Sequence, residues 1–200
     1  IMGSEVFVPY LISIIYLLVS ELFLNNPDVI QNWSMTFMAQ LYIALPFASF
    51  NTLCMINTPN GVQYYYWYAL SLFIFLWSSD TGAYVFGSLF GKHKLFERIS
   101  PKKTWEGSIG GGLTAIIASQ VIASFEPFTS TVSGIENNLL WAGLALLTVI
   151  MGTWGDLVES LFKRKVGIKD SGNILPGHGG MLDRFDSSLI AIPTAVIYIY

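Results

Sequence analysis

The sequence predicts an all-α, polytopic integral membrane protein with about six transmembrane helices in this chain. Its composition is the first observation: 53% of the 200 residues are hydrophobic and only 12% are charged, whereas a soluble domain carries roughly a quarter charged residues. The mean hydropathy is +0.56. The second observation is that all ten Lys and Arg residues fall within residues 92–103 and 163–184. This distribution is typical of a membrane protein with two basic loops.

The composition also excludes several other classes. The high apolar content excludes a disordered chain, and the single Cys54 excludes a disulfide-stapled secreted module. The net charge of −3 gives no basic field, so no nucleic-acid partner is expected. Residues 1–5 lack the positive charge of a secretory signal peptide. Because the chain begins at Ile1 and ends inside an apolar run, we expect it to be part of a longer protein.

The helices in the first half follow from apolar stretches that can cross a hydrocarbon core of about 30 Å. Residues 6–24 predict the first helix. Residues 33–56 predict the second, with a kink at Pro46. The turn signal at 58–61 separates it from a third helix over 63–90, which opens in an interfacial belt of Tyr and Trp.

Three further helices are predicted in the second half. Residues 107–125 begin with a run of small residues, which lets helices approach closely. Residues 139–162 form the fifth helix, and a sixth begins near Ser187. Ser100 and Pro101 are interpreted as an N-terminal signal before the fourth helix, whose first N–H groups can bind an anion.

The basic residues also predict the orientation. Positive charge stays on the cytoplasmic side, and two helices separate the two basic windows, so both loops emerge on that side. The connection at 126–138 carries two Glu and no Lys or Arg, as an external loop should. We therefore expect residues 1–200 to form a single transmembrane domain, with cytoplasmic loops at about 91–106 and 163–186.

Two carboxylates inside apolar helices are functional candidates, because each costs about 2.5–3.5 kcal/mol to insert. Asp80 is interpreted as a ligand for a metal, proton or substrate in preference to a packing carboxylate bonded to nearby hydroxyls. Asp156 shares one helical face with Glu159, Ser160 and Lys163. A solvated helix end with an intrahelical Glu159–Lys163 pair explains those two residues but leaves the deeper Asp156 unexplained.

The second basic loop combines three kinds of residue that together indicate phosphate chemistry. Its cations suit phosphate oxygens, and the Gly179–Gly180 pair lets backbone N–H groups approach an anion. Asp183 and Asp186 are hard ligands that suit Mg²⁺. A mere topology signal or lipid-headgroup contact is the alternative, and it leaves the carboxylates and glycines without a role. His93 and His178 are too isolated for a zinc site, and His178 is expected to bond a phosphate or orient a carboxylate.

The run from Ser160 to Asp186, SLFKRKVGIKDSGNILPGHGGMLDRFD, resembles the signature of phosphatidate cytidylyltransferases (CDP-diacylglycerol synthases). Weaker blocks of the same family lie at 80–84, 91–95 and 100–107. The resemblance covers residues 75–200, and the earlier residues agree only in being apolar. The signature positions that match at the family spacing are Ser160, Lys163, Arg164, Lys169, Asp170, Pro176, His178, Gly179, Gly180, Asp183, Arg184 and Asp186.

The resemblance implies transfer of CMP from CTP to phosphatidic acid, which gives CDP-diacylglycerol and pyrophosphate in phospholipid biosynthesis. It further implies a Mg²⁺-dependent site with K⁺ as the candidate second ion, and a homodimer in a bacterial inner membrane. Asp156 and Asp183 are the implied metal ligands, with Asp80 as a further candidate. The implied catalytic residues are Asp156, Lys169, Asp183, Arg184 and Asp186. The implied phosphate-binding residues are Lys102, Lys103, Lys163, Arg164, His178, Gly179 and Gly180.

Two alternatives remain open. One is a related CTP-dependent membrane lipid enzyme, such as a polyprenol kinase or an archaeal-lipid cytidylyltransferase. The other is an ion-coupled transporter that uses Asp80 and Asp156. The sequence shows no internal repeat of the kind that transporters carry, and a transporter leaves the glycines and cations of the second loop without a role.

Overall fold

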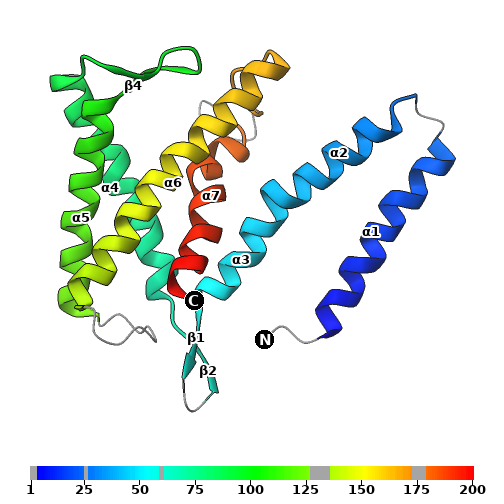
Figure 1. Ribbon diagram of the computed structural model, residues 1–200, viewed down its shortest axis with the longest axis horizontal. Coiled ribbons are helices and arrows are strands. Elements are labelled where there is room, and N and C mark those ends of the chain that lie inside the picture. Colours follow the sequence, from blue (N-terminus) through cyan, green and yellow to red (C-terminus); the bar gives the residue numbers. More distant parts are fainter. Residues whose placement is uncertain (1–3, 25–26, 59–60, 127–135, 173–178) are drawn as a thin grey trace. The chain divides into compact units, whose positions relative to one another are not determined.

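The computed structural model describes residues 4–24, 27–58, 61–126, 136–172 and 179–200. These residues are mostly helical (Figure 1), and the chain divides into two compact units, Ile1–Ala44 and Leu45–Tyr200. All of the site residues that the sequence predicts belong to the second unit.

The first unit holds α1 (Ser4–Leu24), α2 (Val29–Ala39) and a π-helical turn, η1 (Gln40–Ala44). The first predicted helix is confirmed. The second begins earlier than expected, and the π-helical turn interrupts it just before Pro46. Because Pro46 has no N–H to donate and its ring crowds the carbonyl four residues earlier, a widened turn at this point has a clear cause.

The second unit begins with α3 (Leu45–Leu53), a hairpin of β1 (Met55–Thr58) and β2 (Gly61–Tyr64), and α4 (Trp67–Phe90). The prediction of helix from residue 63 was wrong, because β2 pairs antiparallel with β1. Gly61 has φ +109°, which favours a glycine and returns the chain along the first strand.

A second hairpin, β3 (Lys94–Phe96) and β4 (Ser100–Thr104), precedes α5 (Trp105–Phe125). Ser100 and Pro101, interpreted as a signal before the helix, therefore lie in a strand, and the fourth predicted helix begins at Trp105. Pro101 lies in a short two-stranded sheet, where a strand without one N–H is tolerated. The helix begins later, because the Thr104 hydroxyl accepts a hydrogen bond of 3.2 Å from the Gly107 N–H as its N-cap.

The remaining elements are α6 (Asn137–Val166) and α7 (Leu182–Ile199), which confirm the fifth and sixth predicted helices. Among the described residues, α4, α5 and α6 are long and apolar enough to cross a membrane. The chain is an all-α polytopic membrane protein, to which the structure adds the two small hairpins.

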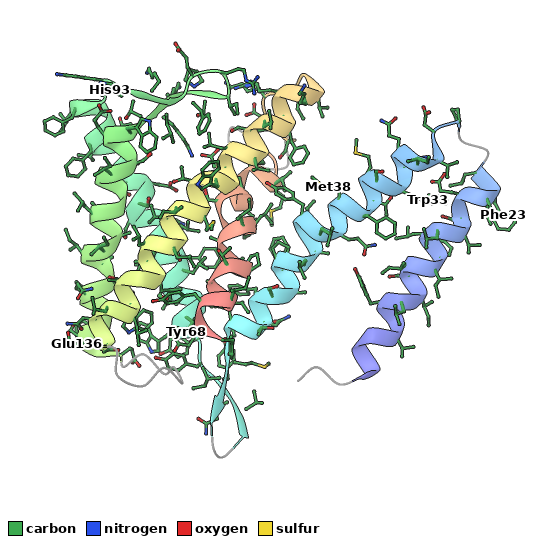
Figure 2. All side chains as sticks on the ribbon, in the orientation of Figure 1. Phe23, Trp33, Met38, Tyr68, His93 and Glu136 are labelled. Carbon is green, nitrogen blue, oxygen red and sulfur yellow. The ribbon has the colours of Figure 1, made fainter. Side chains whose placement is uncertain are left out.

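Small residues allow the helices of the second unit to pack closely. A Cβ on Gly111 of α5 would lie 2.7 Å from the Ser79 carbonyl of α4, and one on Gly155 of α6 would lie 2.6 Å from the Asp186 carbonyl of α7. Tyr68 (Figure 2) and Trp141 are wholly buried with their ring centroids 5.7 Å apart. This packing brings the β3–β4 hairpin and the C-terminal end of α6 to the same end of the unit (Figure 1).

Candidate functional site

A lysine of the first basic window forms an ion pair with α6, the helix that leads into the second window. Lys103 Nζ of β4 lies 2.5 Å from Asp156 Oδ2, and the two side chains are 27% and 28% exposed. Ser160, one turn further along α6, donates a hydrogen bond of 3.2 Å to Asp156 Oδ1. Asp156, the intramembrane carboxylate predicted from the sequence, is therefore neutralised by a cation from the first basic window.

Two more carboxylates interact with this ion pair. Asp80 of α4 and Asp186 of α7 both interact electrostatically with Lys103 and Asp156. Burial raises the pKa of Asp186 to about 6, and the negative charge of Asp156 adds to this effect, while the Ser187 N–H and Lys103 oppose it. We call these four residues, which come from four different elements, the Lys103 cluster.

A second network is centred on Asp183, in the first turn of α7. Its Oδ1 accepts a hydrogen bond of 2.7 Å from Lys163 Nζ. Its Oδ2 accepts three bonds of 2.8 Å, from the N–H and hydroxyl of Ser171 and from the Gly180 N–H. Burial alone would raise the pKa of Asp183, but the ammonium and these donors hold it well below its ordinary value.

Glu159 completes this second network, which we call the Asp183 network. Its side chain is wholly buried, and its Oε2 lies 2.5 Å from Lys163 Nζ. Among the described residues, Glu159 Oε1 has no hydrogen-bond partner. The intrahelical pair with Lys163 is confirmed, but the expected solvated helix end was wrong, because the face that carries Glu159 packs inside the unit.

The Gly179–Gly180 pair serves an anion that belongs to the chain itself. The Gly180 N–H donates to the Asp183 carboxylate, and a Cβ on Gly180 would lie 2.3 Å from Ser171 Oγ. Gly179 has φ +82°, a backbone conformation that residues other than glycine rarely adopt. Gly180 therefore approaches a carboxylate of the chain itself, and the predicted approach of the glycine pair to a substrate phosphate stays a prediction.

The structure places the other predicted residues at the same end of the unit. Lys102, Arg164, Lys169 and Arg184 are exposed there, while His178 lies outside the described residues. Sequence reasoning missed Ser171 and the burial of Glu159. The spacing of Glu159 four residues before Lys163 indicated that the two residues pair, but it did not indicate that Glu159 is buried.

The carboxylates of the Lys103 cluster fit a magnesium ion, because they offer oxygen ligands at a position that already holds a positive charge. No three His, Cys, Asp or Glu side chains in the described part of the chain form a ready-made metal cage. Mg²⁺ does not require one, because it is usually held by one or two carboxylates together with water and substrate phosphates. The Lys103 ammonium beside Asp156 shows that this position accommodates a cation. Asp183 is less open to a metal, because both of its oxygens already accept hydrogen bonds.

Comparisons with known proteins identify the family of the chain. Residues 3–200 match the model of the cytidylyltransferase family. The chain is 50% identical over 129 residues to a phosphatidate cytidylyltransferase of Staphylococcus saprophyticus, which covers 63% of this chain and 46% of that protein. It is 46% identical over 156 residues to the protein of the same name from Staphylococcus haemolyticus, covering 73% of this chain and 56% of that one.

A phosphatidate cytidylyltransferase of Staphylococcus aureus is 48% identical over 126 residues, which make up 63% of this chain and 46% of the relative. The chain thus spans about half the length of the relatives it matches. The resemblance carried by the run from Ser160 to Asp186 is confirmed, and the chain belongs to the cytidylyltransferase family.

Proposed function

We propose that the protein to which this chain belongs transfers CMP from CTP to phosphatidic acid, forming CDP-diacylglycerol and pyrophosphate. The observation that carries the proposal is the ion pair of Lys103 with Asp156, which joins a cation of the first window to a carboxylate on the helix that leads into the second. The names of the staphylococcal relatives support the same activity.

The reaction needs little help from a general base. A phosphate oxygen of phosphatidate is ionised near neutral pH and attacks the α-phosphorus of CTP. The bond from that phosphorus to the oxygen bridging to the β-phosphate breaks, and pyrophosphate leaves with the bonding electrons. The barrier arises mainly from bringing two polyanions together, so positioning and fixed positive charge lower it.

The residues of the Lys103 cluster and of the Asp183 network supply this positioning and this positive charge. We assign Lys102, Lys103, Lys163, Arg164, Lys169 and Arg184 to the phosphates of the two substrates, together with His178, Gly179 and Gly180. Because Asp183 holds Lys163 and the loop residues Ser171 and Gly180, it fixes the direction in which that ammonium points. Asp186 supports the cluster around Lys103 from α7.

Asp156 would hold Mg²⁺, with Asp80 as a further ligand and K⁺ as the candidate second ion. Asp183, the other ligand that the resemblance implies, would contribute only by exchanging one of its hydrogen bonds from Lys163, Ser171 or Gly180 for the metal. When bound, the metal supplies charge neutralisation of the triphosphate and polarises its α-phosphate. Lys103 is held by Asp156, which places its ammonium beside the carboxylate that would hold the metal and within the set of cations assigned to the substrate phosphates.

We place this site at the cytoplasmic face of a bacterial inner membrane, in a homodimer. The shared location of both basic windows supports the cytoplasmic assignment. Mass determination in detergent by light scattering tests the dimer. Labelling of a cysteine introduced at Lys94 by a membrane-impermeant reagent, in intact cells and in inverted vesicles, tests the side.

The activity is tested by incubating the purified protein with labelled CTP, phosphatidate and Mg²⁺. We expect CDP-diacylglycerol and pyrophosphate in equal amounts, and none without a divalent ion. A kinase would instead release CDP and leave a phosphorylated lipid, and a transporter would form neither product. The proposal is wrong if no CDP-diacylglycerol appears with Mg²⁺, Mn²⁺ or Co²⁺.

A further inference from the structure

An apolar groove of about 490 Å³ lies between α5 and α6, next to the β3–β4 hairpin. Phe96 of the hairpin and Trp154 of α6 meet across its end as an edge-on ring pair with centroids 6.1 Å apart. Ile109 and Leu113 of α5 form one wall and are 61% and 53% exposed. In a membrane, this wall is open to lipid.

A smaller, polar pocket of about 230 Å³ adjoins the groove. Its lining includes Asp80, Lys102 and Lys103. Ser108 of α5 and Thr153 of α6 line both cavities, so these two side chains stand where the polar pocket passes into the groove. The apolar space therefore leads directly to two cations of the first basic window.

This pair of cavities matches the two halves of an anionic lipid. An acyl chain can pass from the bilayer into an apolar groove without leaving an apolar medium, and a phosphomonoester is attracted by paired lysines. Lys103 is also bonded to Asp156, so a phosphate held in the polar pocket lies next to the carboxylate assigned to the metal. A neutral lipid or a second protein helix would fill the groove without using these charges.

We propose that the α5–α6 groove is the acyl-chain subsite for phosphatidate, with the phosphomonoester of that lipid in the pocket of Lys102 and Lys103. This inference rests on the proposed function, because it identifies where the lipid substrate of that reaction binds. Ser108 and Thr153 then flank the glycerol region of the lipid.

The first test measures binding alone and uses the unmodified protein. Phosphatidate and phosphatidylcholine, each with the same photoreactive diazirine acyl chain, are cross-linked in detergent micelles, and the adducts are mapped by mass spectrometry. We expect phosphatidate adducts within residues 109–116 and 146–157 at least fivefold above those of phosphatidylcholine, and competition by unlabelled phosphatidate. Equal labelling by both lipids would mean ordinary boundary lipid and would overturn the proposal.

Because cross-linking needs no turnover, this test separates the two claims. Phosphatidate-selective adducts in a protein that makes no CDP-diacylglycerol would sustain the groove and overturn the proposed reaction. CDP-diacylglycerol synthesis by a protein without such adducts would sustain the proposed reaction and overturn the proposed groove.

The second test narrows the groove at Gly112, where a Cβ would meet nothing within 4 Å. We expect Gly112→Phe to lower kcat/KM at least tenfold for phosphatidate with eighteen-carbon chains and less than threefold for eight-carbon chains, with KM for CTP unchanged. Val121→Phe is the matched control, since Val121 is 54% exposed on the same helix and lies outside the groove. An equal effect on both chain lengths in a folded Gly112→Phe protein would contradict the proposal. If that variant does not fold, the cross-linking result decides.

Discussion

Lys103 Nζ lies 2.5 Å from Asp156 Oδ2, so a cation of the first basic window neutralises an intramembrane carboxylate next to the second. The two residues come from a surface hairpin and from the C-terminal half of a transmembrane helix. Their contact shows that the charges expected to orient the chain in the membrane also belong to its candidate catalytic site. It also gives the hairpin a function, because β4 carries the lysine to α6.

The substitution Lys103→Gln tests whether this ion pair serves catalysis more than stability. We expect kcat/KM to fall about 100-fold, as when one preorganised charged donor is removed from a site. The free energy of unfolding should change by less than about 1 kcal/mol, because the pair is partly exposed. Steady-state kinetics and thermal unfolding in detergent measure the two effects. Lys94→Gln, on the exposed strand β3 of the same hairpin, is the control and should retain its activity. A similar loss in both variants would show that only the overall charge of the loop matters.

The substitution Glu159→Gln tests the buried end of the Asp183 network. Glu159 is wholly buried beside Lys163, so loss of its charge removes a charge-assisted contact and should cost about 1.5–3 kcal/mol of stability. We expect a lower apparent Tm together with reduced turnover, because Lys163 is then held by Asp183 alone.

A double-mutant cycle separates the pair from its surroundings. The double variant Glu159→Gln/Lys163→Met should lose less stability than the two single variants added together, because it leaves neither charge unpaired. Additive losses would mean that the two side chains do not interact. Glu97→Gln on the exposed part of the hairpin is the control for a change of net charge.

The substitution Gly180→Ala tests the loop that closes on Asp183. Its Cβ would lie 2.3 Å from Ser171 Oγ and 2.6 Å from the Gly172 nitrogen, so the loop must shift and the Gly180 bond to Asp183 must lengthen. We expect activity to fall at least tenfold. Gly167→Ala is the control, because Gly167 has φ +75° with nothing within 4 Å of its Cβ. It should lose only about 1 kcal/mol of stability from backbone strain. Equal activity of the two variants would argue against a fixed loop.

The long helices were predictable from the sequence because membrane spans leave a strong local signal. Residues 107–125 and 139–162 were correctly assigned, with boundaries that moved by a few residues. The two hairpins were missed, because their strands are only three to five residues long and depend on pairing with a neighbouring strand. A short apolar or basic run beside a helix does not reveal such pairing.

In the candidate site, too, residues in a local sequence pattern were predictable, whereas contacts between distant elements were not. The signature run located Asp183 and its glycines, and the intramembrane position of Asp156 made it a candidate. The contact of Lys103 with Asp156 and the full burial of Glu159 depend on how α6 packs against its neighbours. No spacing along the chain predicts either of them.

The central claim is that Asp156 helps to hold a divalent ion together with CTP. Mn²⁺ in place of Mg²⁺ allows direct measurement, by the electron paramagnetic resonance signal of free Mn²⁺ during titration with and without CTP. We expect the purified protein to bind Mn²⁺ only weakly without CTP and at least tenfold more tightly with it. In Asp156→Asn this CTP-dependent gain should be lost, while the Glu97→Gln control retains it. Unchanged CTP-dependent Mn²⁺ binding by a folded Asp156→Asn protein would contradict the account.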